Sequence, residues 1–194
     1  NAAELLSQTI SGDSIQSSIN FGDSFVVGDF NGDGYDDLAV SADGYDKGVV
    51  DSDEGAILIY LGAFGGLGTS PTVRITGYGE DDEIGWYGLA NLGDVNGDGR
   101  DDLGFSDEDL NTYIFWGKSV FSAIYNLSNE PPNSTNFTVF SDDIINDNTF
   151  YVRGLGDING DGYDDIGWSS WGNAYVLYGG LSWNSFYENL DSLS

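Results

Sequence analysis

Residues 29–37 read DFNGDGYDD, a string with four aspartates, one asparagine and two glycines in nine positions. Two near-copies follow it, DVNGDGRDD at 94–102 and DINGDGYDD at 157–165. The strings begin at residues 29, 94 and 157, so they are 65 and 63 residues apart. Such regular spacing indicates an internal structural repeat, and the repeat is the strongest statement that the sequence makes about the fold.

Apolar stretches with the spacing of β-strands surround each acidic string. The stretches before the strings are FVVG, LANLG and YVRGLG, and those after them are LAVS, LGFS and IGWS. Longer apolar runs that end in glycine follow at 58–62, 113–117 and 175–179. Their β-branched and aromatic residues are typical of buried strands. The segments TVRITG (72–77) and NFTVFS (136–141) are predicted to be outer strands.

Each unit therefore contains about four short strands in roughly 60 residues, with the acidic string in the hairpin between the first and second strands. Four antiparallel strands repeated in series predict an all-β fold made of β-propeller blades. The predicted blades cover approximately residues 13–77, 78–141 and 142–194, and residues 1–12 are predicted to be an outer strand of an adjoining blade. Because a propeller needs at least four blades, three units predict a partial or assembled propeller.

The composition limits what such a domain can do. The chain has 194 residues and a net charge of −28, from 33 acidic and 5 basic residues. That charge repels nucleic acids and anionic lipid surfaces. Cysteine and histidine are absent, which excludes disulfides, zinc sites built on them and Ser–His catalysis. No apolar run approaches the ~20 residues of a membrane helix, so we expect no membrane insertion. The chain starts at Asn1, and we expect it to be a piece of a longer protein.

Each acidic string has the ligand pattern of a calcium loop. Oxygen-bearing side chains stand at positions 1, 3, 5 and 9, glycine at position 6 allows a sharp turn, and position 7 can offer its carbonyl. Calcium takes six to eight oxygen ligands in flexible geometry, whereas magnesium demands a tighter octahedron. We predict about three Ca²⁺ ions. The predicted ligands are Asp29, Asn31, Asp33, Tyr35 and Asp37; Asp94, Asn96, Asp98, Arg100 and Asp102; and Asp157, Asn159, Asp161, Tyr163 and Asp165.

Two other interpretations of the strings are weaker. An EF-hand needs a glutamate at position 12 and a helix on each side, but position 12 is Val40, Phe105 or Trp168 and the flanks resemble strands. Simple Asn/Gly-rich hairpin turns would not need aspartate at positions 1, 5 and 9 in all three copies. The first unit also has a longer segment at 42–55, which favours a surface insertion; a recognition loop or a cation site using Asp51, Asp53 and Glu54 is the alternative.

The string GDFNGDGYDDLAVS (28–41) and its two partners resemble the FG-GAP repeats of the integrin alpha-chain propeller. The family's Phe-Gly is present as Phe21-Gly22 and becomes Ile84-Gly85 in the second unit, while the third unit has no clear equivalent. The family's Gly-Ala-Pro end is replaced by VSAD, FSDE and WSSW. The resemblance implies a Ca²⁺-binding loop in each blade hairpin and a parent propeller with more blades.

The function that follows by resemblance is extracellular adhesion or ligand recognition, with a protein or glycan on the cell surface or matrix as partner. Further blades would come from the same parent chain or from other subunits. A lectin-like module, with Trp86, Tyr87, Trp171 and Trp183 as candidates for sugar stacking, is the alternative, as is a non-catalytic part of a polysaccharide-active enzyme. We predict no catalytic residues, and no enzyme activity for this chain.

Overall fold

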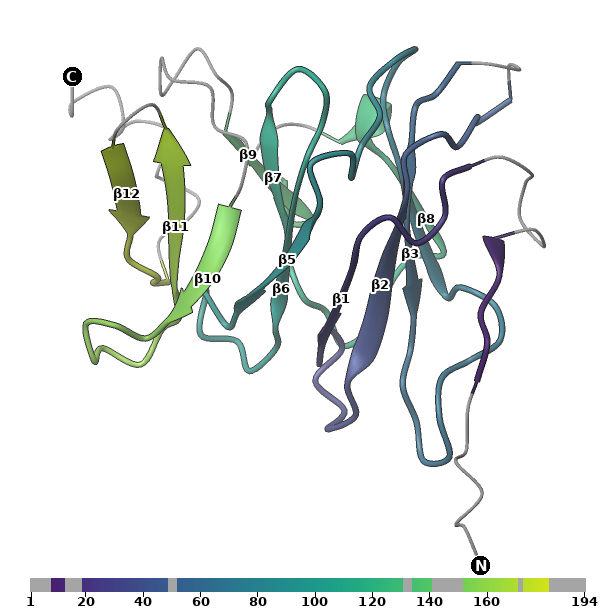
Figure 1. The fold of residues 1–194 in the computed structure, drawn as a ribbon. Coiled ribbons are helices and arrows are strands. Elements are labelled where there is room, and N and C mark those ends of the chain that lie inside the picture. The colour runs from purple at the N-terminus through teal and green to yellow at the C-terminus, as the bar shows by residue number, and fades with distance from the viewer. Residues whose placement is uncertain are drawn as a thin grey trace, which may run out of the picture.

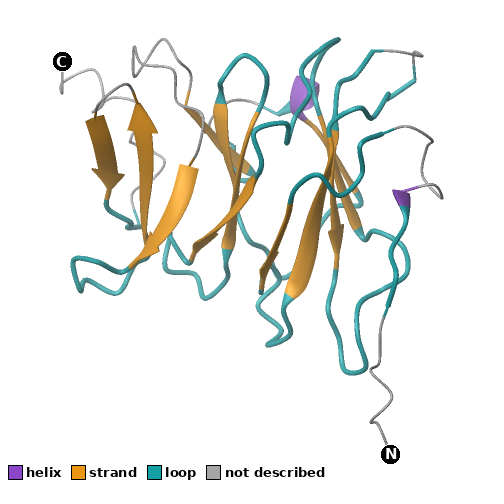
Figure 2. Ribbon diagram, viewed as in Figure 1, coloured by secondary structure: helices purple, strands orange, loops and turns teal. Residues whose placement is uncertain are grey.

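The computed structural model describes residues 8–12, 19–48, 52–130, 134–140, 152–170 and 173–181. These residues form three β-sheets, and helical structure among them is limited to short 3-10 turns such as η2 (Leu127–Asn129). Figure 2 shows how strands dominate the described part of the chain. None of its helices is long and apolar enough to cross a bilayer. The prediction of an all-β fold built from blade-like sheets is confirmed.

The first blade contains four consecutive antiparallel strands. These are β1 (Phe25–Gly28), β2 (Asp37–Ala42), β3 (Ala56–Tyr60) and β4 (Val73–Thr76). They lie in the order β1-β2-β3-β4, and the register pairs Gly28 with Asp37 at the base of the acidic hairpin. The central strand β3 is buried along its whole length. Its continuous run of apolar residues is therefore explained by neighbours on both faces of the sheet.

The second and third blades repeat this arrangement. The second blade contains β5 (Leu89–Gly93), β6 (Asp102–Ser106), β7 (Thr112–Phe115) and β9 (Phe137–Phe140). The third contains β10 (Val152–Gly156), β11 (Asp165–Ser170) and β12 (Asn173–Leu177). All strand pairs inside these two sheets are antiparallel. Each strand coincides with, or overlaps, an apolar stretch of the sequence, so the predicted strands are found where the structure describes the chain.

One strand departs from the predicted four-stranded units. The segment β8 (Ile124–Asn126) belongs to the second repeat in sequence, yet it pairs in parallel with β4 at the outer edge of the first blade. The first sheet therefore has five strands, one of them parallel. The neighbouring side chains explain this position, because Tyr125 and Leu127 are buried in the core between the first two blades. Burial of these two residues fixes the segment beside β4.

The blades stack face to face, with an apolar core in each interface. Side chains of β2, β3 and β4 meet Phe105, Phe115 and Phe137 of the second blade in one core. Leu92 and Ile114, on the opposite face of the second blade, meet the third blade in another. The first strands of the blades are neighbours, since β5 contacts both β1 and β10. Figure 1 shows the three sheets side by side, with their acidic hairpins at the same lower edge.

The outward face of the first blade is covered by the N-terminal part of the chain. Ile19 is buried on Val40, Leu58 and Tyr60, and Ile10 packs against the same cluster. Residues 8–11 have no strand pairing, and the side chain of Gln8 bonds the backbone of residues 67 and 68. Residues 1–7 lie outside the described part of the chain. The outer strand predicted there therefore stays a prediction.

Candidate metal centres

Each acidic string forms the hairpin loop between the first and second strands of its blade, as predicted. The loops reverse direction sharply at two glycines, which have φ angles of +73° and +87° at Gly32 and Gly34. The corresponding glycines of the other two loops also have positive φ angles, from +75° to +94°. Only glycine adopts this conformation without steric cost, which explains why both positions are repeated.

The first aspartate of each loop organises the backbone around its carboxylate. In the first loop, Asp29 Oδ1 accepts hydrogen bonds from the N–H groups of Gly32 and Asp33, and Oδ2 accepts one from Gly34. Asp94 and Asp157 receive the same kind of bonds in their loops. The N–H groups of Gly162, Gly160 and Asp161 lower the pKa of Asp157 below its ordinary value. This aspartate is therefore held as an anion at the centre of the loop.

The side chains at positions 3 and 5 bond backbone N–H groups of their own loop. Asn31 Oδ1 accepts from Asp33 N, and Asp33 Oδ1 accepts from Tyr35 N. Asn96 in the second loop makes the equivalent bond, and Asn159 and Asp161 make both of them in the third. The second loop adds an ion pair of 3.3 Å between Arg100 Nη1 and Asp98 Oδ1. Four predicted ligands of each loop are thus tied to one short turn.

The side chain at position 7 packs against the preceding loop. A Cβ on Gly32 would come within 2.9 Å of Arg100 Cγ, and one on Gly97 would come within 2.3 Å of Tyr163 Cε1. Tyr35 has no preceding loop in this chain and is 45% exposed. The sequence suggested only a carbonyl ligand at these three positions. The structure adds a packing role for the Arg100 and Tyr163 side chains.

The aspartate at position 9 is buried in all three blades. Asp37, Asp102 and Asp165 each accept a hydrogen bond of 2.8 or 2.9 Å from the glycine N–H that follows the third strand. The second carboxylate oxygen of Asp102 and of Asp165 accepts from the backbone N–H at position 2 of its own loop. Asp37 Oδ2 is buried without a hydrogen bond of ordinary geometry, although the Phe30 N–H at position 2 is close enough to lower the pKa of Asp37. One oxygen in the first loop therefore lacks the compensation that burial demands.

Burial makes two of these carboxylates hard to ionise. Removal from water, together with the nearby charges of Asp33 and Asp29, raises the pKa of Asp37 to about 6, although the bond from the Gly62 N–H lowers it. Burial also raises the pKa of Asp102 to about 8, with smaller contributions from Asp98 and Asp94. In each of these two loops, three nearby carboxylates therefore repel one another when all of them are ionised. A bound cation would relieve that repulsion.

The aspartate at position 8 joins neighbouring blades, a role that the sequence did not reveal. Asp101 Oδ2 accepts a 3.0 Å hydrogen bond from the backbone N–H of Asp29, and Asp101 N donates to the carbonyl of Asp29. Asp164 makes the same pair of bonds to Asp94. The exposed carboxylate of Asp36, in the first blade, receives no hydrogen bond from the described residues. Because the aspartate at position 8 is repeated next to the ligand positions, the sequence alone does not distinguish its role from theirs.

The donor chemistry of the loops suits calcium, although their carboxylates are not gathered around a common point. All the predicted ligands are hard oxygens, which is the donor type that calcium prefers. Among the described residues, no group of three or more His, Cys, Asp and Glu side chains is close enough to hold a metal ion. The carboxylates at positions 1 and 5 are instead turned toward backbone N–H groups. Ion binding would have to draw these oxygens together.

The insertion at 42–55 uses its acidic residues to close on itself. Glu54 Oε2 accepts from Lys47 N at 2.8 Å and from the Ser52 hydroxyl at 2.7 Å. Asp46 Oδ1 accepts from the N–H groups of Ser52 and Asp53. Asp51 lies outside the described residues. The Glu54 carboxylate therefore has a structural role, and the alternative of an added cation site there stays a prediction.

A buried aspartate in the loop between β6 and β7 should make stability depend on pH. Asp107 is buried and accepts from Asn111 N, Asn111 Nδ2 and the Tyr113 hydroxyl, each at 2.8 Å. Burial raises its pKa above the ordinary value of 3.8 in spite of these bonds. Because the folded state holds this proton more tightly than the unfolded state, the contribution of Asp107 to stability should fall as pH rises above about 4.

Urea unfolding of wild type and Asp107→Asn from pH 4 to pH 7, with EGTA present, measures this effect. The stability of wild type relative to the variant should decrease with increasing pH, and any constant cost of the substitution should leave the slope unchanged. Asp109→Asn, at an exposed neighbouring position, is the matched control. A wild-type stability that rises with pH relative to Asp107→Asn would contradict the raised pKa.

The three stacked sheets and their acidic hairpins define a β-propeller-type repeat protein. Residues 21–60 match the family model of the FG-GAP repeat. This segment of the chain is therefore an FG-GAP repeat, the repeat of integrin alpha-type propellers. The match covers the first blade from Phe21-Gly22 to the end of β3, including the first acidic loop. The resemblance found in the sequence is thus confirmed.

Part of the chain is also similar to phosphatidylinositol-glycan-specific phospholipase D from three mammals. The identity is 40% to the mouse protein, 39% to the human protein and 38% to the rat protein, over 89 residues in each case. The matched segment is 45% of this chain and 10% of each relative. The chain therefore spans about a tenth of the length of these curated relatives.

Proposed function

We propose that this chain is a calcium-binding FG-GAP propeller module that serves extracellular adhesion or ligand recognition. The observation that carries the proposal is the same acidic loop, built three times on the same hairpin of successive blades. A structural turn needs the glycines and one capping carboxylate. It does not need an asparagine at position 3 and two further aspartates at positions 5 and 9 in every copy. These additional oxygens are explained by a cation that binds inside each loop.

The side chains of each loop would share the work of holding the ion. The carboxylates at positions 1, 5 and 9, the amide oxygen at position 3 and the carbonyl at position 7 supply the oxygens. When bound, calcium supplies positive charge that offsets repulsion among the carboxylates. In the first loop it would also give Asp37 Oδ2 the partner that it lacks. The backbone N–H bonds to Asp29 and Asp33 hold the turn in place before the ion binds.

An extracellular location and a binding role follow from this chemistry. Calcium modules outside cells work with dissociation constants of about 10⁻⁴ to 10⁻³ M, because the ion is abundant there. The net charge of −28 disfavours nucleic acid as a partner. We therefore propose a protein or glycan of the cell surface or matrix as the partner. Recognition, rather than catalysis, is the proposed activity of the chain.

Further blades are also proposed as partners, because the third blade presents a face that the earlier blades bury. In the second blade this face is at most 7% exposed, at Leu92, Val95, Ile114 and Trp116. The residues at the same repeat positions in the third blade are 39–55% exposed, at Leu155, Ile158, Val176 and Tyr178. A following blade, from the same parent chain or from another subunit, would cover this apolar face as the third blade covers the second.

Calorimetric titration with CaCl₂ tests the proposal directly. Wild type should bind about three ions, one for each loop. Asp29→Ala, Asp94→Ala and Asp157→Ala should each remove one ion, because each substitution deletes the central carboxylate of one loop. Asp23→Ala, at an exposed position outside the loops, should leave the number of ions unchanged. If wild type takes up no calcium, or if the three loop variants retain full stoichiometry, the metal assignment is wrong.

A further inference from the structure

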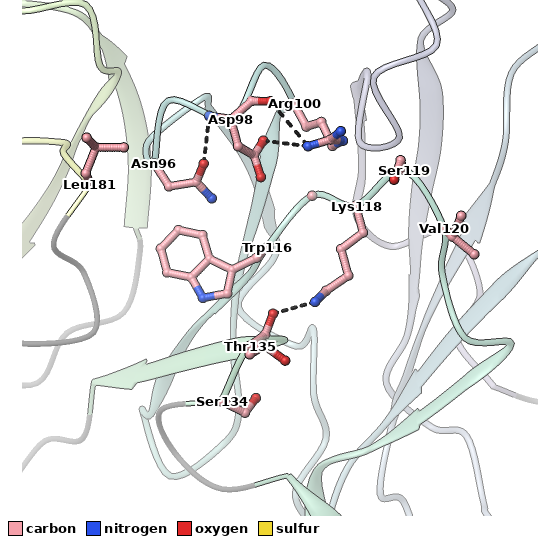
Figure 3. A pocket seen from close by; sticks show the side chains of 11 residues that line it. Asn96, Asp98, Arg100, Trp116, Lys118, Ser119, Val120, Ser134, Thr135 and Leu181 are labelled. Atoms are coloured by element: carbon pink, nitrogen blue, oxygen red, sulfur yellow. Dashed lines mark hydrogen bonds and ion pairs between the residues drawn. The ribbon is translucent and has the colours of Figure 1, made fainter.

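Basic side chains are scarce in this protein, and two of the five line one pocket. The pocket has a volume of about 520 Å³ and lies beside the second acidic loop. Arg100 and Lys118 line it together with Trp116 and the carboxylate of Asp98, and Asn96, Ser119 and Thr135 add amide and hydroxyl groups. Figure 3 shows the Trp116 ring between Asn96 and Thr135, with Lys118 reaching beside it. Two of the few cations of a strongly acidic molecule thus line one pocket, next to the carboxylate of Asp98.

The internal repeat shows that the blade fold does not require these side chains. Arg100 occupies position 7 of its loop, where the other two loops have Tyr35 and Tyr163. Lys118 follows the glycine after the third strand, where the other blades have Ala63 and Gly180. Both cations therefore replace neutral residues at matched positions. A change that serves folding alone would be expected in all three blades.

The two cations keep donors that the protein itself does not use fully. Lys118 Nζ donates to the Thr135 carbonyl, and no carboxylate of the described residues lies within ion-pair distance of it. Burial lowers the pKa of Lys118, which marks a partly desolvated ammonium. Arg100 pairs with Asp98 through Nη1, but its Nε is buried without a hydrogen-bond partner. An anionic group in the pocket would not reach the buried Arg100 Nε, but it would accept from Lys118 Nζ and from the Arg100 guanidinium donors that Asp98 does not engage.

We propose that this pocket binds an acidic saccharide, with the carboxylate or phosphate at Lys118 and Arg100 and the sugar hydroxyls at the polar lining. The indole of Trp116 supplies an apolar wall, although the ring itself is 7% exposed. The volume lies within the range of small-ligand sites. The net charge of the chain opposes anions at long range, but salt screens exposed charges beyond about 8 Å. Within that distance, Lys118 and Arg100 oppose the one lining carboxylate, that of Asp98.

This inference rests on the proposed recognition function and adds a class of ligand to it. The pocket is separate from the aromatic residues that the sequence suggested for sugar stacking. Of those, Trp86 is 55% exposed, while Trp171 and Trp183 lie outside the described part of the chain. Trp116 matches Leu61 and Tyr178 in the repeat, which favours a structural role. Its place in the pocket gives it a second role.

Calorimetric titrations with D-glucuronate, glucose 6-phosphate and glucose test the site in the full chain. Glucuronate, glucose 6-phosphate or both should bind at least tenfold more tightly than neutral glucose. The variants Arg100→Tyr and Lys118→Ala restore the residues of the other blades, so they should keep the fold. Each should weaken binding of the acidic sugar at least tenfold and leave glucose unaffected. A preference between the two acids distinguishes a carboxylate site from a phosphate site.

Lys47→Ala is the matched control, because it removes one positive charge away from the pocket. Lys47 Nζ bonds the carbonyl of Gly77 and the side chain of Asn126 and does not line the pocket. Equal affinity for glucose and both acids, absence of binding, or an equal loss in Lys47→Ala would overturn the proposal. Calcium stoichiometry is measured separately in the same variants. Three bound ions together with absent sugar binding would reject the pocket while leaving the calcium loops intact.

Discussion

Calcium in hundredfold excess over its dissociation constant should raise the melting temperature of this protein by about 20 °C. Each filled site adds about 2.7 kcal/mol under that condition, and three independent sites add about 8 kcal/mol. A domain of this size gains roughly 2–4 °C for each kcal/mol. The physical source is the relief of carboxylate repulsion in loops where Asp37 and Asp102 resist ionisation. Thermal melts followed by circular dichroism, with EGTA or with CaCl₂, measure the shift.

Magnesium and a loop variant separate site binding from a general effect of salt. Magnesium prefers a tight octahedron and retains its waters, so it should give a much smaller shift at the same concentration. A triple variant, Asp29→Ala, Asp94→Ala and Asp157→Ala, should melt at the same temperature with and without calcium. An equal shift in the triple variant would assign the stabilisation to diffuse screening of the net charge of −28.

Replacing Asp101 with alanine should destabilise the protein by about 2 kcal/mol, because it removes a charged tie between the first two blades. Asp101 Oδ2 accepts from Asp29 N at 3.0 Å and from Asn91 Nδ2 at 2.9 Å. Both donors would lose a charged acceptor. Asp164→Ala should have a similar effect, because it removes the acceptor of Asp94 N at the next interface. Urea unfolding in the presence of EGTA measures both variants without a contribution from calcium.

The repeat provides the matched control within the same molecule. Asp36→Ala removes the aspartate at the same loop position, but its exposed carboxylate accepts no hydrogen bond from the described residues. Its cost should stay below about 0.5 kcal/mol, as for most surface substitutions. Comparable losses in Asp36→Ala and Asp101→Ala would show that position 8 acts within its own loop, and the proposed tie between blades would then be wrong.

Much of the fold could be predicted because short strands leave a strong periodic signal. The continuous apolar run around Ile57 and Ile59 indicates a strand that is buried along its length, as the structure shows. The alternation around Ala39 indicates a strand but not its burial, because Ala39 and Val40 are both buried. The glycines of the acidic loops likewise indicate sharp turns, and Gly32 and Gly34 have the expected positive φ angles. These features are local, so each can be recognised without knowing which blade neighbours which. Because the three units repeat the same pattern, the strands predicted for one blade also predict those of the others.

The features that the sequence concealed depend on contacts between repeats. Parallel pairing of β8 with β4 arises from burial of Tyr125 between two blades, and nothing in the segment IYN (124–126) itself indicates a partner. Asp101 and Asp102 are adjacent and chemically identical, yet one reaches the neighbouring blade and the other is buried in its own. The pocket beside Trp116 similarly required the positions of Arg100 and Lys118 in space.

The two ends of the stack are unlike, and this gives the module a direction. At the leading end, Ile10 and Ile19 already occupy the surface of the first sheet, which seals that side against a newcomer. At the trailing end, Val176 and Tyr178 remain open to solvent. A further sheet can therefore pack on the trailing side directly, whereas on the leading side it would meet Ile10 and Ile19 first. The two faces of the stack would thus present different surfaces to a neighbouring blade.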